Sequence, residues 1–211
     1  FEFRASSFEC SISMEITLEQ IKELRDETGV SVMQVKLALE ESKGDMEKAR
    51  MALRKKSGEI ATKKGDRALG AGVISAYIHA GGNVGALVEL ACETDFVAKN
   101  EDFKKLAYEI AMHVAAMNPK YNRLIDVAEG DRSNAVAFFQ DEVEKLDKPG
   151  PIKGKILQGK LDTYFKEQTL VEQPYVKNPE MTIGDLVKGA VQKFGENTEL
   201  VRFTRFAVGK Q

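Results

Sequence analysis

The sequence predicts an α+β protein, in which a small three-helix domain precedes an antiparallel sheet core of about three strands covered by helices. Residues 14–57 carry three short apolar stripes at helical spacing. Residues 71–92 hold two apolar segments around a glycine-rich turn, which is typical of a β-hairpin. Amphipathic segments follow, and a further strand lies near the carboxyl end. This order predicts an all-α domain, a linker and an α+β domain.

Composition is that of an ordinary soluble globular protein. The 211 residues are 43% hydrophobic and 30% charged. No apolar run approaches the ~20 residues that a membrane helix needs. Lys and Arg total 31 against 33 Asp and Glu, for a net charge of -2. That balance lacks the basic excess of a nucleic-acid binder. We therefore expect a protein or small-ligand partner, with no direct nucleic-acid contact and no membrane.

Cysteine and histidine usage argues against a metal centre or a nucleophilic enzyme. The chain has two cysteines, Cys10 and Cys92, and two histidines, His79 and His113. This is neither a disulfide framework nor a zinc spacing, and it indicates a reducing compartment. Cys92 falls on an apolar strand face, where a thiol is usually inert. His113 has helical spacing to apolar neighbours and is expected at the core or its boundary. We expect no cofactor and no metal.

Residues 1–13 do not match the patterned chain that follows, and Met14 has the look of a natural start. This tail is expected to be a cloning remnant, an upstream in-frame read or the remnant of a transit peptide. It lacks the apolar centre of a secretory signal, and the fold prediction leaves it out.

Residues 14–57 are expected to form the helical domain. Thr17 with Gln20 and Ser31 with Gln34 have the spacing of capping boxes. The apolar stripes that follow comprise Leu18, Ile21 and Leu24, then Val32, Val35 and Leu39, then Met46, Ala49 and Leu53. Each stripe is too small to stabilise its own helix, so the three helices should pack on one another.

A charged, partly helical linker at residues 58–70 is expected to lead into the core domain, residues 71–211. Residues 73–79 and 84–92 read as the strands of a hairpin, with a turn at residues 80–83. Both faces of the second strand are largely apolar, which predicts that helices cover at least one of them.

The remaining elements follow from caps, breaks and periodicity. The predicted helices are residues 101–117, begun by Asn100 and stopped by Asn118-Pro119; residues 135–146; residues 152–165, after a break at residues 148–151; and residues 183–194, between Thr182 and Gly195. Residues 170–176 are expected to be extended, and residues 200–208 form the last strand. Its apolar phase changes between Phe203 and Phe206, which predicts a bulge or burial on both faces.

The candidate site is the strand-to-helix corner at residues 93–100. Asp95 is either a helix-terminus charge or a functional acid, and Phe96 is either a core residue or an exposed interface anchor. Arg25 is either a surface cation or an interface residue, and His79 beside the glycine turn is either a solvated polar residue or a contact. The residues alone leave each pair of alternatives open.

Two long stretches resemble the signatures of a known family. Residues 24–39, LRDETGVSVMQVKLAL, and residues 89–100, ELACETDFVAKN, are similar to the amino-terminal and core signatures of translation elongation factor Ts. This family comprises the guanine-nucleotide exchange factors for elongation factor Tu. The resemblance covers Met14 to about Lys210. Ala91, Gln34 and Leu37 depart from the usual residues, which should alter packing or affinity rather than role.

The resemblance implies that residues 14–57 are a ubiquitin-associated-like domain that docks on the nucleotide-binding domain of elongation factor Tu, with Arg25 at the contact. It implies that the corner of Thr94, Asp95, Phe96 and Val97 binds the partner and that the Asp95–Phe96 pair intrudes near the partner's magnesium site, while His79 helps to displace its phosphate-binding loop. GDP then leaves without any bond being made or broken, so the protein is not an enzyme. The rival reading is a ubiquitin-associated-like adaptor of a ribosome- or translation-associated protein, without exchange activity.

The resemblance also suggests a short form with one core repeat and no inserted coiled-coil hairpin. Short relatives pair two chains, which would give a 2:2 complex with elongation factor Tu. Some seal that pair with a cysteine in the last strand, where this chain has Thr204, so no such disulfide is expected. The implied location is the bacterial cytoplasm, or an organelle matrix if residues 1–13 are a transit remnant.

Overall fold

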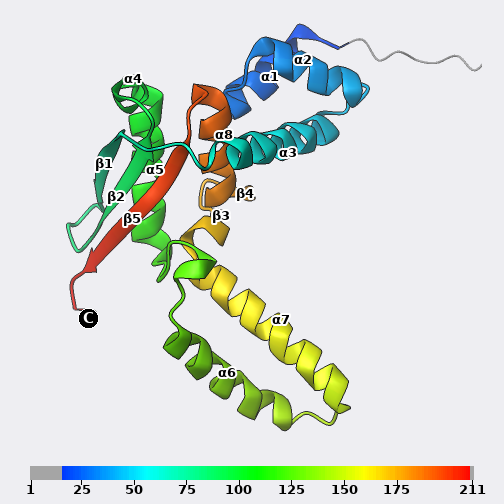
Figure 1. The fold of residues 1–211 in the computed structure, drawn as a ribbon, viewed down its shortest axis with the longest axis vertical. Helices are drawn as coiled ribbons and strands as arrows, with labels where there is room; N and C mark the ends of the chain where they lie inside the picture. Colours follow the sequence, from blue (N-terminus) through cyan, green and yellow to red (C-terminus); the bar gives the residue numbers. More distant parts are fainter. Residues whose placement is uncertain (1–15, 210–211) are drawn as a thin grey trace, which may run out of the picture. The chain divides into compact units, whose positions relative to one another are not determined.

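The computed structural model describes residues 16–209, so the expected tail at residues 1–13 and the start at Met14 lie outside the described residues. The α+β prediction is confirmed, with helices first and an antiparallel three-stranded sheet after them (Figure 1). The chain divides into two compact units, whose boundary lies between Lys56 and Ser57.

The first unit is built from α1 (Leu18–Thr28), α2 (Val32–Glu41) and the first half of α3 (Met46–Lys64). Thr17 and Gln20 make both bonds of a capping box, and Gly29 ends α1 in the left-handed conformation with φ 66°. The predicted stripes meet in one core, made of Leu24, Val30, Val35, Ala38, Leu39, Ala49 and Leu53.

Helix α3 runs through Lys64 and takes up the first half of the segment expected to be a linker. No proline interrupts it, and Lys63 and Lys64 in its last turn suit the negative end of the helix dipole. The last turns of α3 lie in the second unit, where the side chains of Ser57 and Lys64 bond to Gln192 and to the Gly195 carbonyl.

The core sheet has the order β1-β2-β5, from β1 (Ala71–Ile78), β2 (Val84–Cys92) and β5 (Thr198–Ala207). Both pairs of strands are antiparallel. One sheet face is covered by α5 (Glu101–Met117) and α8 (Ile183–Phe194). The fully buried side chains beneath them include Val88, Leu90, Cys92, Phe103, Ile110, Val114 and Ile183.

The bulge expected in the last strand exists, but it lies earlier than the sequence indicated. Arg202 pairs with Glu89 and Leu200 pairs with Leu90, so Val201 is the extra residue. The apparent phase change near Phe206 has another cause, because Phe206 is exposed and lies on the uncovered sheet face. An apolar residue on that face was mistaken for a core residue.

The helices expected at residues 135–146 and 152–165 are present, and they pair with each other, which the sequence did not predict. Helices α6 (Glu129–Glu144) and α7 (Gly150–Gln168) fold back on each other, and Figure 1 shows them side by side. They share a small core of their own, made of Tyr121, Val127, Ala135, Leu161 and Phe165 with partly buried aromatic neighbours. The break expected at residues 148–151 falls at the turn of this hairpin, where α6 ends at Glu144 and Pro149 is the N-cap residue of α7.

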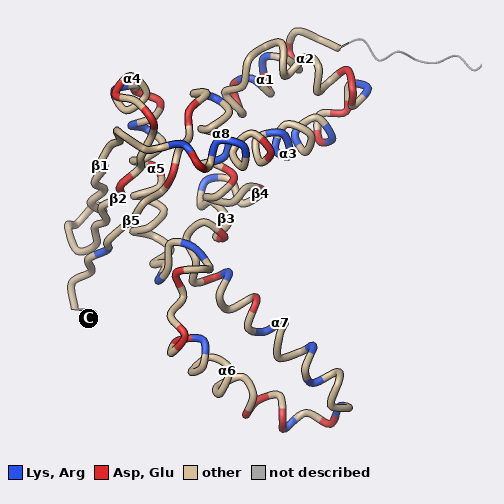
Figure 2. Tube along the Cα trace, viewed as in Figure 1, with Lys and Arg blue, Asp and Glu red and all other residues tan. Residues whose placement is uncertain are grey.

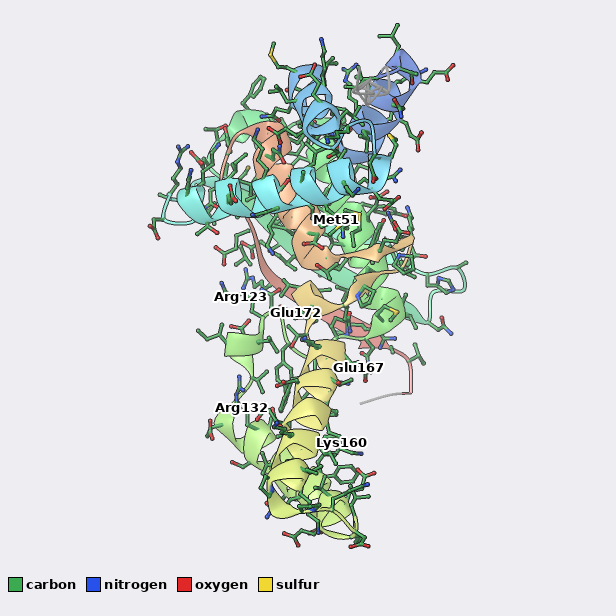
Figure 3. The ribbon with its side chains drawn as sticks, turned by 90° about the vertical axis from the view of Figure 1, so that its right-hand side faces the viewer. Met51, Arg123, Arg132, Lys160, Glu167 and Glu172 are labelled. Atoms are coloured by element: carbon green, nitrogen blue, oxygen red, sulfur yellow. The ribbon has the colours of Figure 1, made fainter. Side chains whose placement is uncertain are left out.

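The rest of the hairpin surface carries many charged side chains, together with a few exposed apolar ones such as Phe138 and Ile152 (Figure 2). Figure 2 shows acidic and basic residues interspersed along both helices, and Figure 3 shows Lys160 and Glu167 along α7. The Lys160 ammonium lies 2.9 Å from a Glu142 carboxylate oxygen and 5.7 Å from the centre of the Phe139 ring. Charged residues narrow the apolar stripe of each helix, so the sequence predicted the two helices but not their pairing.

A second, two-stranded sheet was not anticipated. The segment expected to be extended begins with a 3-10 turn, η2 (Leu170–Glu172), and only then forms β3 (Pro174–Tyr175). β3 pairs with β4 (Asn178–Thr182), whose sequence NPEMT contains little strand signal.

His113 is fully buried on α5, which agrees with the expectation of a core position. Its Nε2 lies 3.0 Å from Gln173 Oε1, and its Nδ1 accepts the Val176 N–H at 3.3 Å. These partners suit a neutral ring with the proton on Nε2, since Nδ1 must accept. Burial lowers the pKa of His113 from 6.5, against the opposing effect of the Gln173 bond.

This lowered pKa predicts a pH-dependent stability. The unfolded chain takes up a proton near pH 6.5 while the folded chain does so only at lower pH, so stability is complete above pH 6.5 and falls below it. We expect a loss of ~1 kcal/mol between pH 7 and 5.5, because the slope per group is at most ~1.4 kcal/mol per pH unit. Urea unfolding at both pH values measures it. His113→Asn should lower overall stability and flatten this slope; an unchanged slope would contradict the assignment.

Candidate functional site

The corner after β2 is an isolated turn of helix. Thr94 is the N-cap residue, with φ -129° and ψ 155°, and α4 (Asp95–Ala98) follows it. Phe96 is 84% exposed, which decides against the core interpretation of this ring. Asp95 is also exposed and pairs with Lys99 at 3.1 Å. We call residues 94–97 the acid–aromatic corner.

Val97 has the opposite environment within the same turn. Its side chain is only 4% exposed and packs into the sheet core. Val97 therefore offers no side-chain surface to a partner, and its contribution is to hold the corner against the sheet. An aromatic residue pointing outward beside an aliphatic anchor pointing inward is the arrangement that keeps Phe96 in solvent.

The turn between α8 and β5 braces this corner through the Glu196 carboxylate and the Asn197 N–H, the second of which bonds to Glu93 next to Thr94. Glu196 accepts bonds from both the Thr94 N–H, at 3.0 Å, and the Thr94 hydroxyl, at 2.6 Å. Glu93 accepts the Asn197 N–H at 2.5 Å and lies within 3.5 Å of Arg67. The Asn197 bond, more than the nearby Arg67 charge, lowers the pKa of Glu93.

Sequence reasoning missed Glu196 and Asn197. A signal for them exists, because Gly195 ends a helix and a strand antiparallel to β2 follows within a few residues. The start of such a strand must lie beside the end of β2. Polar residues at that point are therefore neighbours of the corner.

Cys92 is buried directly beneath the corner and is a free thiol. Its Sγ donates to the Thr94 carbonyl at 3.3 Å. Burial raises the pKa of this thiol, and the Glu196 charge raises it further. The thiol therefore stays protonated at neutral pH, as an inert core cysteine does.

His79 does not lie near the corner. It is exposed at the far end of the β1–β2 hairpin, where the Tyr77 hydroxyl lies 3.1 Å from its Nδ1. Ala71 pairs with Cys92 at one end of the ladder and Ile78 pairs with Gly85 at the other. Seven residue steps at ~3.4 Å each separate these ends, or roughly 24 Å. A partner that contacts both His79 and the acid–aromatic corner therefore does so at two separate places.

Arg25 is exposed on α1, in the first unit. Its carbonyl accepts the Gly29 N–H at the end of the helix, and its side chain points to solvent rather than into the core. The exposed apolar residues of the same unit include Leu18, Val32, Met33, Leu37 and Met51.

The uncovered face of the sheet is also apolar. The register places Ile74, Ile78, Leu87, Thr204 and Phe206 on this side, and we call these residues the outer face. All five are exposed. Glu89 and Arg202 pair across the same surface at 2.5 Å. An apolar sheet surface of this kind is a common interaction surface.

Within residues 16–209, no group of three or more His, Cys, Asp or Glu side chains is arranged to hold a metal ion. Among the helices of that same range, none is both long and apolar enough to cross a membrane.

The fold and the site together define the class of protein, in which a three-helix unit is followed by an α+β core that presents an exposed acid–aromatic corner. The family model "Elongation factor TS" matches residues 14–210. Elongation factor Ts of Carboxydothermus hydrogenoformans is 45% identical over 195 residues, 92% of this chain and 90% of the relative. Those of Coprothermobacter proteolyticus and Thermotoga neapolitana are 45% and 43% identical, over 93% and 94% of this chain and 100% of each relative.

The chain belongs to the elongation factor Ts family and is a translation elongation factor. The resemblance of residues 24–39 and 89–100 to that family is thereby confirmed.

Proposed function

We propose that this protein is a guanine-nucleotide exchange factor that binds elongation factor Tu in its GDP form and promotes GDP release. The observation that carries the proposal is Phe96, an 84% exposed aromatic ring beside an exposed carboxylate, on a braced turn of a family member. A large exposed aromatic on a fixed support is typical of an interface hot spot.

The mechanism follows from how GDP is held. A nucleotide bound through Mg²⁺ depends on fixed positions of the phosphate loop and the metal ligands. Phe96 inserted between side chains of the partner shifts those positions, and the Asp95 carboxylate disturbs the charge balance around Mg²⁺. Thr94 and Val97 set the direction of this intrusion. Arg25 docks on the partner's nucleotide-binding domain, and His79 acts on the phosphate-binding loop from a second place.

Exchange of this kind is a binding equilibrium rather than a reaction. The factor must bind the nucleotide-free partner more tightly than the GDP form, and GDP weakens the factor's own binding by the same coupling free energy. No bond is made or broken, so the protein acts without a cofactor and is not an enzyme in the chemical sense. The bacterial relatives support the cytoplasm as its compartment; an organelle matrix would require a transit peptide.

The test is the release of labelled GDP from purified elongation factor Tu, with and without this protein. Acceleration that saturates with protein concentration is the expected result. Binding to elongation factor Tu or to ribosomes without any acceleration would instead favour the non-exchanging adaptor.

We further infer that two chains pair through the outer face, which gives a 2:2 complex with the partner. Isolated three-stranded sheets rarely leave several large apolar residues in water, and a second copy would cover them. Sedimentation should give a dimer for the native chain, without a disulfide since Thr204 replaces the sealing cysteine. Ile74→Asp should give a monomer, because pairing would then bury an unpaired charge.

A native chain that sediments as a monomer, alone and with partner, would contradict this pairing. Ile125→Asp is the matched control, since Ile125 is also a largely exposed isoleucine but lies in η1 (Leu124–Asp126), outside the sheet. It should leave the dimer unchanged.

A further inference from the structure

The acid–aromatic corner is not held by its own helix. α4 is a single turn of four residues, and a turn this short has no intrinsic stability. Its N-cap residue does not cap it, since the Thr94 side chain makes no bond to the α4 backbone. Val97 fixes one side of the turn through apolar contact, but such contact is non-directional and does not by itself set the direction of Phe96.

Glu196 supplies the missing constraint. One carboxylate oxygen accepts the Thr94 N–H at 3.0 Å and the other accepts the Thr94 hydroxyl at 2.6 Å. Bonds to an ionised acceptor are stronger than neutral ones, and two together fix orientation as well as distance. They restrain Thr94, the residue directly before Asp95 and two before Phe96.

Glu196 is itself fixed on both sides. Gly195 before it is in the left-handed conformation with φ 73°, and the helix-end bond of its N–H to the Val191 carbonyl holds it there. Asn197 after it is buried, and its amide group donates to the Gly65 and Arg67 carbonyls. Its N–H donates to Glu93, next to Thr94. The carboxylate that holds the corner thus projects from a rigid turn.

We propose that Glu196 is a positioning residue for nucleotide exchange, which holds Thr94 so that Asp95 and Phe96 meet the partner in one orientation. This inference rests on the proposed function. Glu196 acts through the corner and need not touch the partner's nucleotide site. A preorganised corner does not have to be ordered during binding, and an unbraced corner would meet the partner in many orientations.

The first experiment compares Glu196→Ala, Glu196→Gln and a control, Glu199→Ala. Glu199 is also an acidic residue and lies at the start of β5, but it pairs with Arg123 at 2.8 Å and does not contact the corner. The saturating rate of GDP release should fall about tenfold for Glu196→Ala, equivalent to ~1.4 kcal/mol. Glutamine retains one acceptor oxygen and should lose about threefold, roughly half that free energy. Glu199→Ala should keep the native rate.

The second readout does not depend on activity. Hydrogen exchange of the Thr94 amide should speed up in Glu196→Ala, while amides of β2 and α5 keep their native protection. Loss of protection throughout the core would mean that Glu196 is needed for folding in general, and would overturn the positioning role. Unchanged exchange at Thr94 would overturn it too.

The third experiment adds Glu196→Ala to a variant that already lacks both oriented groups, Asp95→Ala with Phe96→Ala. If Glu196 acts by orienting Asp95 and Phe96, this triple variant should be no slower than the double variant, because the groups being oriented are gone. If Glu196→Ala lowers the rate of GDP release further, so that the effects of the substitutions multiply, Glu196 has a separate role and the inference is overturned. Failure of the proposed function looks different, since Phe96→Ala would then have no effect on GDP release.

Discussion

Phe96→Ala is expected to lower the saturating rate of GDP release from elongation factor Tu by about 30-fold, equivalent to the ~2 kcal/mol of an interface hot spot. The stability of the protein should change by no more than ~0.5 kcal/mol, because the ring is 84% exposed and supports nothing in the core. Stopped-flow release of a fluorescent GDP analogue measures the first quantity, and urea unfolding measures the second.

Ile125→Ala serves as the control for this experiment. Ile125 is 82% exposed, so Ile125→Ala also removes a large exposed apolar side chain, but at a place away from the acid–aromatic corner. It should leave GDP release at the native rate. Native exchange by Phe96→Ala, or unfolding of that variant, would refute the role given to the corner.

Phe103→Ala is expected to have the largest effect on stability, a loss of ~3–5 kcal/mol. Phe103 is fully buried under the first turn of α5, and its ring meets Phe194 edge-on with centres 5.6 Å apart. Truncation leaves a cavity between α5 and α8 that the packed core cannot fill. Urea unfolding followed by far-UV circular dichroism measures the loss.

A loss below ~1 kcal/mol for Phe103→Ala would mean that the core relaxes around the missing ring. Phe103→Leu keeps most of the volume and should recover much of the stability. The exchange rate of either variant, measured where it remains folded, should stay near native. Phe96 and Phe103 thus separate function from folding, although they are seven residues apart and chemically identical.

Phe96 and Phe103 also show which features of the structure could be predicted from the sequence. Helix caps and stripes are local signals, so the starts of α1 and α2 and both ends of α5 and α8 were predicted as they are observed. The orientation of Phe96 is not local. It depends on Val97 reaching the core and on Thr94 bonding to a residue 102 positions away. Periodicity has no access to such contacts, so the residues alone left Phe96 undecided until the family resemblance was considered.

The failures have the same origin. Both helices of the α6–α7 hairpin were predicted but their pairing was not, because it depends on aromatic contacts and ion pairs between residues that are distant in the sequence. β4 is a strand because β3 pairs with it, despite a sequence of low strand propensity. The bulge lies at Val201, whereas the sequence placed it between Phe203 and Phe206, because the exposed Phe206 was taken for a core residue.

The backbone bonds at the base of the α6–α7 hairpin affect how well this chain tolerates insertions and deletions there. The peptides that enter and leave it are bonded to each other, with Gln168 O accepting from Lys120 N and Tyr121 N, and Tyr121 O accepting from Leu170 N. Because both ends of the excursion meet at one point, its length is uncoupled from the sheet. Evolution, or a protein engineer, is free to lengthen, trim or replace this arm while the acid–aromatic corner keeps its scaffold.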